Sequence, residues 1–149
     1  MSNAEKVFEK YIKGTPPQAI VRDLTIVFCS LTNAVQRVCK FRVANVHITT
    51  KVLKKNYDKR TAQENDFLLK SGWKVVRIPD EIYLNKSAKR GDYLFAKRIN
   101  NDLYVASIEV EFSNNIETLY VVSMFKVRKE SYLSNYKLVW SWKGGEPSS

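Results

Sequence analysis

The spacing of apolar residues changes along this chain, from the 3.6-residue period of a helix near its start to the two-residue alternation of strands in its second half. Apolar residues between positions 20 and 38 recur at helical spacing, and the Thr-Pro-Pro-Gln string at 15–18 is typical of a helix start. A long helix over residues 16–40 is therefore expected. Residues 93–99, 103–112 and 118–127 are expected to be strands joined by Asn- and Ser-rich turns. This order predicts a single α+β domain, with N-terminal helices packed on a four-stranded antiparallel sheet.

Shorter segments complete this prediction. Residues 5–13 are expected to form a short helix that ends at Gly14, and residues 41–48 are expected to form a short strand. Thr49 is expected to cap a short basic helix. A capping box at 61–64 opens a further helix that is expected to end near Lys70, at a Ser-Gly break. Residues 73–84 are ambiguous, and 138–142 are a candidate fourth strand. The expected domain runs over 1–149, with an N-terminal helix at 1–14, a core at 15–142 and a flexible tail at 143–149.

Strand alternation assigns side chains to faces. In the strand at 103–112, every second residue from Tyr104 onward is expected to face the helices, while Ser107, Glu109 and Glu111 face the other way. In the next strand, Ser123 is in phase with apolar residues and is expected on their face. Lys126 and Arg128 are two residues apart and are expected to share a face.

The charge of the chain is concentrated in one segment. Residues 37–60 contain eight Lys or Arg and one acid, Asp58, which makes +7 out of a net +10 for the 149 residues. A basic surface of this kind attracts a polyanion, of which nucleic acid is the commonest, although many charge runs are only solvated faces. Nucleic acid is therefore the partner that the charge predicts, and the resemblance described below narrows it to RNA.

Composition limits the other classes of function. No apolar run approaches the roughly 20 residues of a membrane span, and the first residues lack the apolar core of a signal peptide, so a cytoplasmic protein without a membrane partner is expected. The chain has one histidine and two cysteines, so its chemistry must depend largely on Lys, Arg, Tyr, Ser and carboxylates. Cys29 and Cys39, placed on the predicted long helix, are expected to be two buried thiols, because their spacing is poor for zinc.

Three strings resemble a family of predicted phage nucleases, the phage barnase–EndoU–colicin–RelE-like family. They are HITTKVLKK at 47–55, IPDEI at 78–82 and LYVVSMFK at 119–126, and the resemblance covers roughly residues 45–142. It implies a RelE/barnase-like fold and a metal-independent endoribonuclease of phage or mobile-element origin, with an antitoxin or immunity protein as a partner. Family members often carry two histidines on the first helix, where this chain offers Lys55 and Arg60. RelE-like members work with Lys, Arg and Tyr instead.

The candidate site follows from what RNA cleavage without a metal requires. A base takes the proton of the ribose 2′-OH, cations stabilise the phosphorane, and an acid protonates the leaving oxygen. Lys55 or Arg60 is expected to contact the phosphate, and Lys126 and Arg128 to stabilise the transition state. The resemblance adds Ser123, which with His47 is a candidate for positioning the nucleophile. Further contacts to nucleic acid are expected from Lys51, Lys54, Lys59 and Tyr57.

Each of these residues also has a structural interpretation, and two other classes of function stay open. The lysines suit a solvated face, Ser123 a core hydroxyl, and Tyr57 and His47 ordinary structural positions. A Mg²⁺-dependent nuclease would use Glu109 and Glu111 with Asp92. A non-catalytic basic module would bind nucleic acid or a protein, with Trp140 and Trp142 as candidate stacking residues. No cofactor or metal is expected for the metal-independent endoribonuclease, which is the function that we favour.

Overall fold

The computed structural model describes residues 1–85 and 92–142. The helices are α1 (Asn3–Tyr11), α2 (Asn33–Cys39), α3 (Thr50–Lys59), α4 (Ala62–Arg77) and the short 3-10 helix η1 (Glu130–Asn135). The strands are β1 (Thr25–Ser30), β2 (Asn45–Thr49), β3 (Glu81–Leu84), β4 (Tyr93–Ile99), β5 (Asp102–Ser113), β6 (Ile116–Lys126) and β7 (Lys137–Ser141). Within this part of the chain, no helix is both long enough and apolar enough to cross a membrane.

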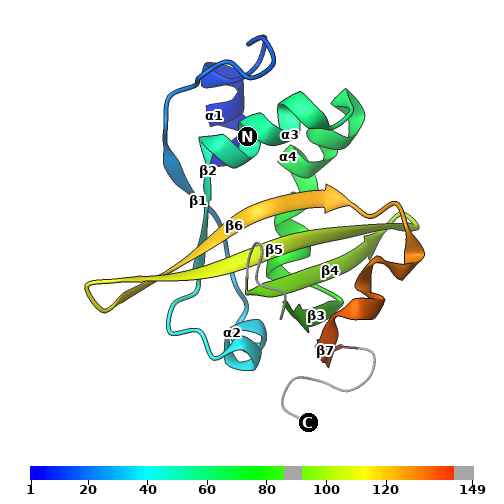
Figure 1. Cartoon of the computed structure of the whole chain (residues 1–149). Helices are drawn as coiled ribbons and strands as arrows, with labels where there is room; N and C mark the ends of the chain where they lie inside the picture. The colour runs from blue at the N-terminus through cyan, green and yellow to red at the C-terminus, as the bar shows by residue number, and fades with distance from the viewer. Residues whose placement is uncertain (86–91, 143–149) are drawn as a thin grey trace.

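The strands form one seven-stranded mixed sheet in the order β1-β2-β6-β5-β4-β3-β7 (Figure 1). Neighbouring strands are antiparallel, except that β2 runs parallel to β6. The α+β class is confirmed, but the predicted four-stranded antiparallel sheet is wrong. The meander β4-β5-β6 and the candidate strand β7 were expected, whereas β1 and β3 come from segments that the sequence pattern assigned to a helix or left ambiguous.

The predicted long helix over residues 16–40 is replaced by a loop, β1 and α2. Apolar residues there satisfy both periods, because Leu24, Ile26 and Phe28 also alternate as a strand requires. Pairing of β1 with β2 decides between the two, and Ile20, which a buried helical stripe would cover, is fully exposed. The later helix α2 is short and begins at Thr32, whose side chain accepts a hydrogen bond from the Val35 N–H.

Helix α4 does not end at the predicted Ser-Gly break but continues to Arg77. Gly72 is buried where the helix crosses the sheet, and a Cβ at this position would lie 2.8 Å from Sδ and Cε of Met124. The glycine therefore serves close packing rather than a turn. With α1 and α3, this helix covers one face of the sheet and encloses the larger hydrophobic core (Figure 1).

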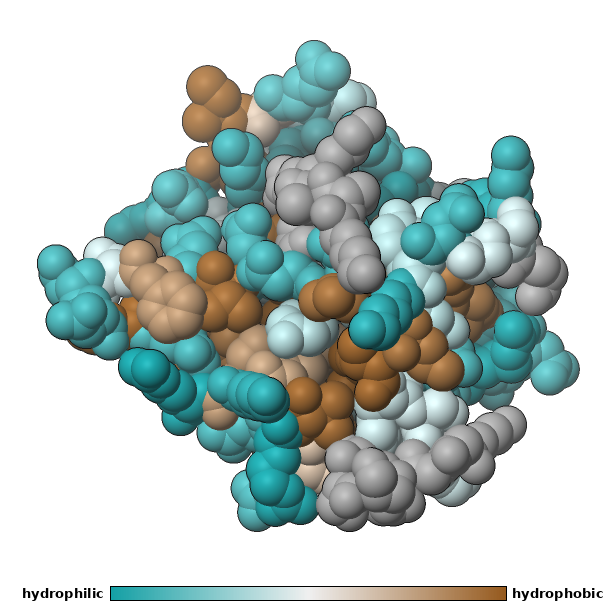
Figure 2. Space-filling model, turned by 60° about the horizontal axis from the view of Figure 1, so that its bottom comes forward, coloured by the Kyte–Doolittle hydropathy of each residue, from teal (hydrophilic) through white to brown (hydrophobic). Residues whose placement is uncertain are grey.

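The other face of the sheet carries a smaller core. Tyr83, Leu94, Ala96 and Val105 pack there against Leu133 of η1, which closes over this face. Seen from below, hydrophobic side chains gather in the middle of the molecular surface with hydrophilic ones around them (Figure 2). Large apolar side chains are also exposed at two places near this side, the tip of the β5–β6 hairpin and β7 with its end: Phe112, Ile116, Leu138, Val139 and Trp142.

A β-bulge in β6 changes which residues share a face. Ser107 pairs with Ser123 and Ile108 with Val121, so Val122 is the extra residue. Val121 packs in the larger core, whereas Phe125 belongs to the smaller core on the opposite face. The prediction that Ser123 shares the face of Val121 is therefore wrong, because the bulge shifts the alternation by one residue.

Candidate anion-binding site

The basic segment at 37–60 does not form one surface. Arg37 and Lys40 lie on and just after α2, at the opposite end of the molecule from α3, which carries Lys51, Lys55 and Lys59 (Figure 1). The concentration of charge in the sequence is therefore divided in space. A binding site has to be sought where cations from different segments meet.

Charge distinguishes the hollows in the described part of the chain. One hollow, called here the arginine pocket, has a volume of about 530 Å³. Four of its lining residues are cationic, Arg60, Lys126, Arg128 and Lys129, and one is a carboxylate, Glu64, which makes a net +3. A second hollow, beside α3, places two lysines against three carboxylates, and its residues include Lys51, Lys55, Asp23, Glu109 and Glu111. A third is balanced in charge, with two cations and two carboxylates. The arginine pocket is thus the hollow best suited to a polyanion.

Glu64 is the centre of the arginine pocket. The side chain of Thr61 caps α4 by accepting from the Glu64 N–H at 3.0 Å, which places Glu64 in the first turn, directly against the end of β6. One oxygen, Oε1, accepts from Arg128 Nη2 at 2.8 Å, and the other accepts from the Lys126 N–H at 3.1 Å. Arg60 Nε lies 3.7 Å from Oε2.

Because the Glu64 carboxylate is buried, it limits where the side chains of Arg60 and Arg128 can lie. The Glu64 side chain is 4% exposed, and a buried carboxylate is costly unless cations and hydrogen-bond donors surround it. Arg128 is 63% exposed, so its guanidinium is held by Glu64 at one edge while it faces solvent. Arg60 lies over the Phe125 ring, 5.6 Å from its centroid, and its Nε has no hydrogen-bond partner among the described residues. Glu64 therefore orients two guanidiniums toward one hollow.

Tyrosines supply the aromatic part of the pocket. Tyr132 lies in η1 and Tyr136 follows it, and their ring centroids are 5.7 Å apart. Tyr132 also meets the Phe125 ring edge to face, at 5.5 Å. Burial, together with a side-chain hydrogen bond to Tyr136, raises the pKa of Tyr132 to about 12, so its phenol stays protonated at neutral pH. Cations beside aromatic rings are typical of sites for single-stranded nucleic acid.

Of the residues expected to act in catalysis, the structure brings Arg60, Lys126 and Arg128 together and leaves three others elsewhere. Lys55 lines the hollow beside α3. His47 lies on β2 opposite Tyr120, six residues along β6 from Lys126, or about 20 Å. Its Nδ1 is 3.4 Å from the Leu119 carbonyl oxygen.

Ser123 is also separate from the pocket, because its hydroxyl donates to Ser107 Oγ at 3.2 Å. Two residues expected to contact nucleic acid are part of the fold instead. The ammonium of Lys54 is buried and donates to Asp58 Oδ1 and to the Pro16 carbonyl, both at 2.7 Å. The Tyr57 hydroxyl accepts from the Gly14 N–H at 2.8 Å, while its ring packs against Phe8. The remaining members of that set, Lys51 and Lys59, are exposed on α3.

Sequence reasoning missed Glu64, Tyr132 and Tyr136. Glu64 was noticed only as the end of a capping box, which correctly located the start of α4 but carried no sign of the arginines. The two tyrosines lie four residues apart after the last long strand, and only η1 turns both toward the pocket. No local pattern distinguishes either group from an ordinary cap or surface loop.

The carboxylates of the alternative metal-dependent site are not gathered. Asp92 accepts from the Val110 N–H at 2.7 Å, while Glu109 and Glu111 line the hollow beside α3. Across residues 1–85 and 92–142, no three His, Cys, Asp or Glu side chains come close enough together to hold a metal ion.

The resemblance to the phage nucleases depends on three short strings, two of which include residues of the site or its surroundings. It stays a prediction. Comparison with family models, with curated proteins and with solved structures found no match for this chain.

Proposed function

We propose that the arginine pocket binds the backbone of RNA and promotes its cleavage without a metal ion. The observation that carries this proposal is the convergence of Arg60, Lys126 and Arg128 on one hollow, where the buried Glu64 fixes the two guanidiniums. These cations come from the end of α3, the end of β6 and the segment beyond it. Arginine is the residue best suited to such a task, since its planar fork matches two phosphate oxygens.

The cleavage reaction is an attack of the ribose 2′-oxygen on the neighbouring phosphorus. A base takes the 2′ proton, the new P–O bond forms, and the bond from phosphorus to the 5′-oxygen breaks. The products are a 2′,3′-cyclic phosphate and a 5′-hydroxyl, which takes up a proton. Arg60, Lys126 and Arg128 stabilise the extra charge on the phosphorane, in the way that preorganised donors stabilise an oxyanion.

A cleavage assay tests the proposal directly. Purified protein is incubated in EDTA with end-labelled single-stranded RNA and with the same strand carrying a 2′-deoxy sugar at the cleaved nucleotide. We expect cleavage of the first and none of the second. Arg128→Ala should lower the rate by about 10²–10³, the effect of losing one transition-state donor. Lys6→Ala, which removes an exposed cation on α1 outside the pocket, is the matched control and should retain the parent rate.

Cleavage of DNA, or activity that requires added Mg²⁺, would contradict the proposed reaction. The analysis of the ends is a further check, because a 2′,3′-cyclic phosphate is the product only of 2′-oxygen attack. An Arg128→Ala protein with the parent rate would show that the chemistry takes place elsewhere.

Binding without cleavage is the second candidate function, and the burial of Glu64 favours it. A carboxylate that is 4% exposed and hydrogen-bonded to Arg128 and to the Lys126 N–H is poorly placed to take a proton from a substrate. The pocket would then bind a phosphate of the RNA without catalysing its cleavage. Tight RNA binding that depends on Arg128, with no cleavage of any RNA, would support this function over the first.

A further inference from the structure

We propose that a second pocket, which shares Tyr136 with the arginine pocket, takes one unstacked nucleobase, so that the ligand of this protein is a single strand. This inference rests on the proposed binding of nucleic acid in the arginine pocket, but it does not require cleavage. It assigns a role to the balanced hollow, which we call the neutral pocket. Its lining includes Asp80, Lys97, Leu103, Leu133, Ser134 and Tyr136.

The residues of η1 and its end divide between the two pockets. Ser131, Tyr132 and Asn135 line the arginine pocket, whereas Leu133 and Ser134 line the neutral pocket. Tyr136 lines both. Tyr136 is thus the residue at which the two pockets adjoin, and a strand with a phosphate among the arginines would place a base beside it.

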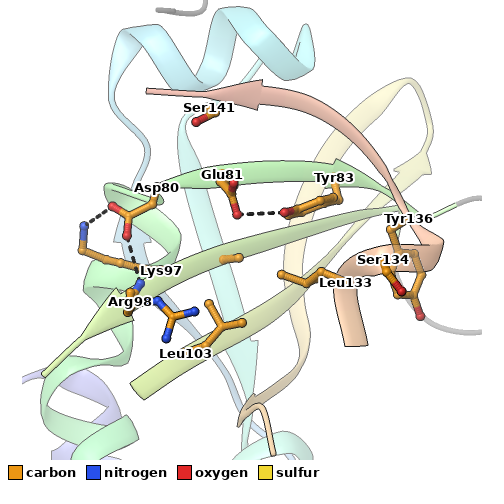
Figure 3. Close-up of a pocket in the computed structure, with 11 residues that line it drawn as sticks. Asp80, Glu81, Tyr83, Lys97, Arg98, Leu103, Leu133, Ser134, Tyr136 and Ser141 are labelled. Carbon is orange, nitrogen blue, oxygen red and sulfur yellow. Dashed lines mark hydrogen bonds and ion pairs between the residues drawn. The ribbon is translucent and has the colours of Figure 1, made fainter. Parts of the chain in front are cut away.

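The chemistry of the neutral pocket suits an uncharged ring with polar edges. Its volume is about 560 Å³, and its two cations are matched by two carboxylates. Lys97 pairs with Asp80 at 3.1 Å at one end, while Tyr136 and Ser134 stand at the other (Figure 3). Between these ends, Leu103 and Leu133 contribute apolar surface. The lining mixes charged and hydroxyl groups with apolar ones, which suits the apolar faces and polar edges of a base, whereas a second phosphate would gain little from matched charges.

Tyr136 is held in place before any ligand binds. Its backbone N–H donates to the Leu133 carbonyl at 3.1 Å, and its ring lies beside that of Tyr132. A ring that already packs against a neighbouring ring loses less freedom when it stacks on a base. A base inside a duplex has both faces covered by its neighbours, so stacking on Tyr136 requires a base that is free of the helix.

The test measures binding by fluorescence anisotropy with strands that cannot be cleaved. The probes are a 2′-deoxy pentanucleotide, the same pentanucleotide lacking all of its bases, and the blunt duplex of the same sequence. The abasic strand keeps the phosphates and loses only the bases. We expect the intact strand to bind the parent protein about 5- to 150-fold more tightly than the abasic strand, which is the range for stacking of one base on an aromatic side chain. The duplex should bind more weakly than the intact strand.

Three variants separate stacking from packing. Tyr136→Phe keeps the ring and should keep the advantage of the intact strand, whereas Tyr136→Leu should reduce that advantage toward 1 while the abasic strand binds as before. Ser134→Trp, at an exposed position, should fill the neutral pocket and act like Tyr136→Leu. Tyr120→Leu is the matched control, because this tyrosine lies on the same sheet and lines neither pocket.

The outcomes distinguish this inference from the proposed function. If RNA is cleaved as proposed but intact and abasic strands bind equally, the nucleobase site is wrong and the function stands. If no RNA is cleaved but the tighter binding of the intact strand depends on Tyr136, the nucleobase site is supported and the proposed reaction is wrong. Equal binding of duplex and single strand would overturn the inference in either case.

Discussion

The role of a charged residue in this protein is set by its burial as much as by its charge. Lys54 and Lys55 are adjacent in the most basic segment, yet Lys54 is buried and Lys55 is exposed. The ammonium of Lys54 joins Asp58 to the Pro16 carbonyl and so ties the loop after α1 to α3. Counting charges along the sequence cannot separate these two roles.

Neutralising Lys54 should therefore destabilise the fold. Lys54→Met keeps the length of the side chain but removes the donor that Asp58 and the Pro16 carbonyl share, so the link between the loop after α1 and α3 is lost. Thermal unfolding followed by circular dichroism should give a lower Tm for Lys54→Met than for the matched control Lys55→Met. Equal Tm values for the two variants would contradict the structural role of Lys54.

The same contact predicts a dependence of stability on pH. Hydrogen bonds from the Lys54 ammonium and the Gln18 N–H lower the pKa of Asp58 below its usual value of 3.8. A carboxyl with a lowered pKa in the fold stabilises the protein fully above its unfolded pKa, and this contribution is lost as the pH falls through the folded pKa. The Tm difference between the parent and Asp58→Asn should be constant at pH 6–7 and shrink below about pH 4. A difference that persists unchanged to pH 3 would argue against it.

The two cysteines should be chemically inert in the folded protein. Cys39 is buried and Cys29 is partly buried. Loss of solvent raises the pKa of both thiols to about 12, and nearby Arg77 offsets only part of this effect at Cys29. Since the thiolate is the reactive form, a thiol reagent at pH 8 should react slowly with the native protein and rapidly with both cysteines in urea. Rapid reaction of either thiol without denaturant would contradict its burial.

Among the elements, α4 connects the fold to the site. Its N-terminal turn presents Glu64 to the arginine pocket, and its middle crosses the sheet at Gly72. The glycine lets the helix lie close to Met124, and this approach keeps the first turn against the end of β6. A change at Gly72 therefore tests the packing on which the site depends.

A branched side chain at Gly72 should overpack this contact. Gly72→Val places atoms where Met124 already lies and should cost about 1–3 kcal/mol of unfolding free energy, the usual range for an enlarged core residue. Lys70→Val, at an exposed position of the same helix, introduces valine away from the sheet and should cost only the smaller loss of helix propensity and of an exposed ion pair with Asp66. Urea unfolding should show the larger loss for Gly72→Val. Equal midpoints in urea would show that α4 does not pack closely on the sheet.

At the scale of the whole molecule, the distribution of charge separates two groups of cations. Arg37 and Lys40 lie with α2 at one end, whereas Lys126 and Arg128 belong to the arginine pocket, which α4 and the end of β6 build. Both groups contribute to the net +10 of the chain. If the proposed site is correct, only the second group contacts a bound strand.

Salt dependence of RNA binding distinguishes the two groups. Each phosphate contact to a single strand adds about 0.7 to the slope of log K against log salt. The double variant Lys126→Ala with Arg128→Ala should therefore reduce the slope by about 1.4, whereas Arg37→Ala with Lys40→Ala should leave it unchanged. A reduced slope in the second double variant would place the bound strand across α2 instead.

The sequence by itself determined those features that neighbouring residues decide. The caps Thr49 and Thr61 begin α3 and α4 as predicted, because a side-chain oxygen there accepts from an N–H three residues away. The turns of the β4–β5 and β5–β6 hairpins also form as predicted, and each has two asparagines with positive φ. The net charge of +10 likewise predicts a negatively charged partner, and this stays a prediction.

Contacts between distant segments decided the rest. The strand β1 exists because β2 lies beside it, and the bulge at Val122 turns Ser123 away from the face that alternation assigns to it. The candidate site shows the same division. Charge in the sequence singles out Arg60, Lys126 and Arg128, but only the fold shows that Glu64 joins them. The fold also places Lys55, His47 and Ser123 away from this pocket. A local pattern records the preferences of a segment, whereas pairing, burial and the meeting of charges depend on which other segment the fold places beside it.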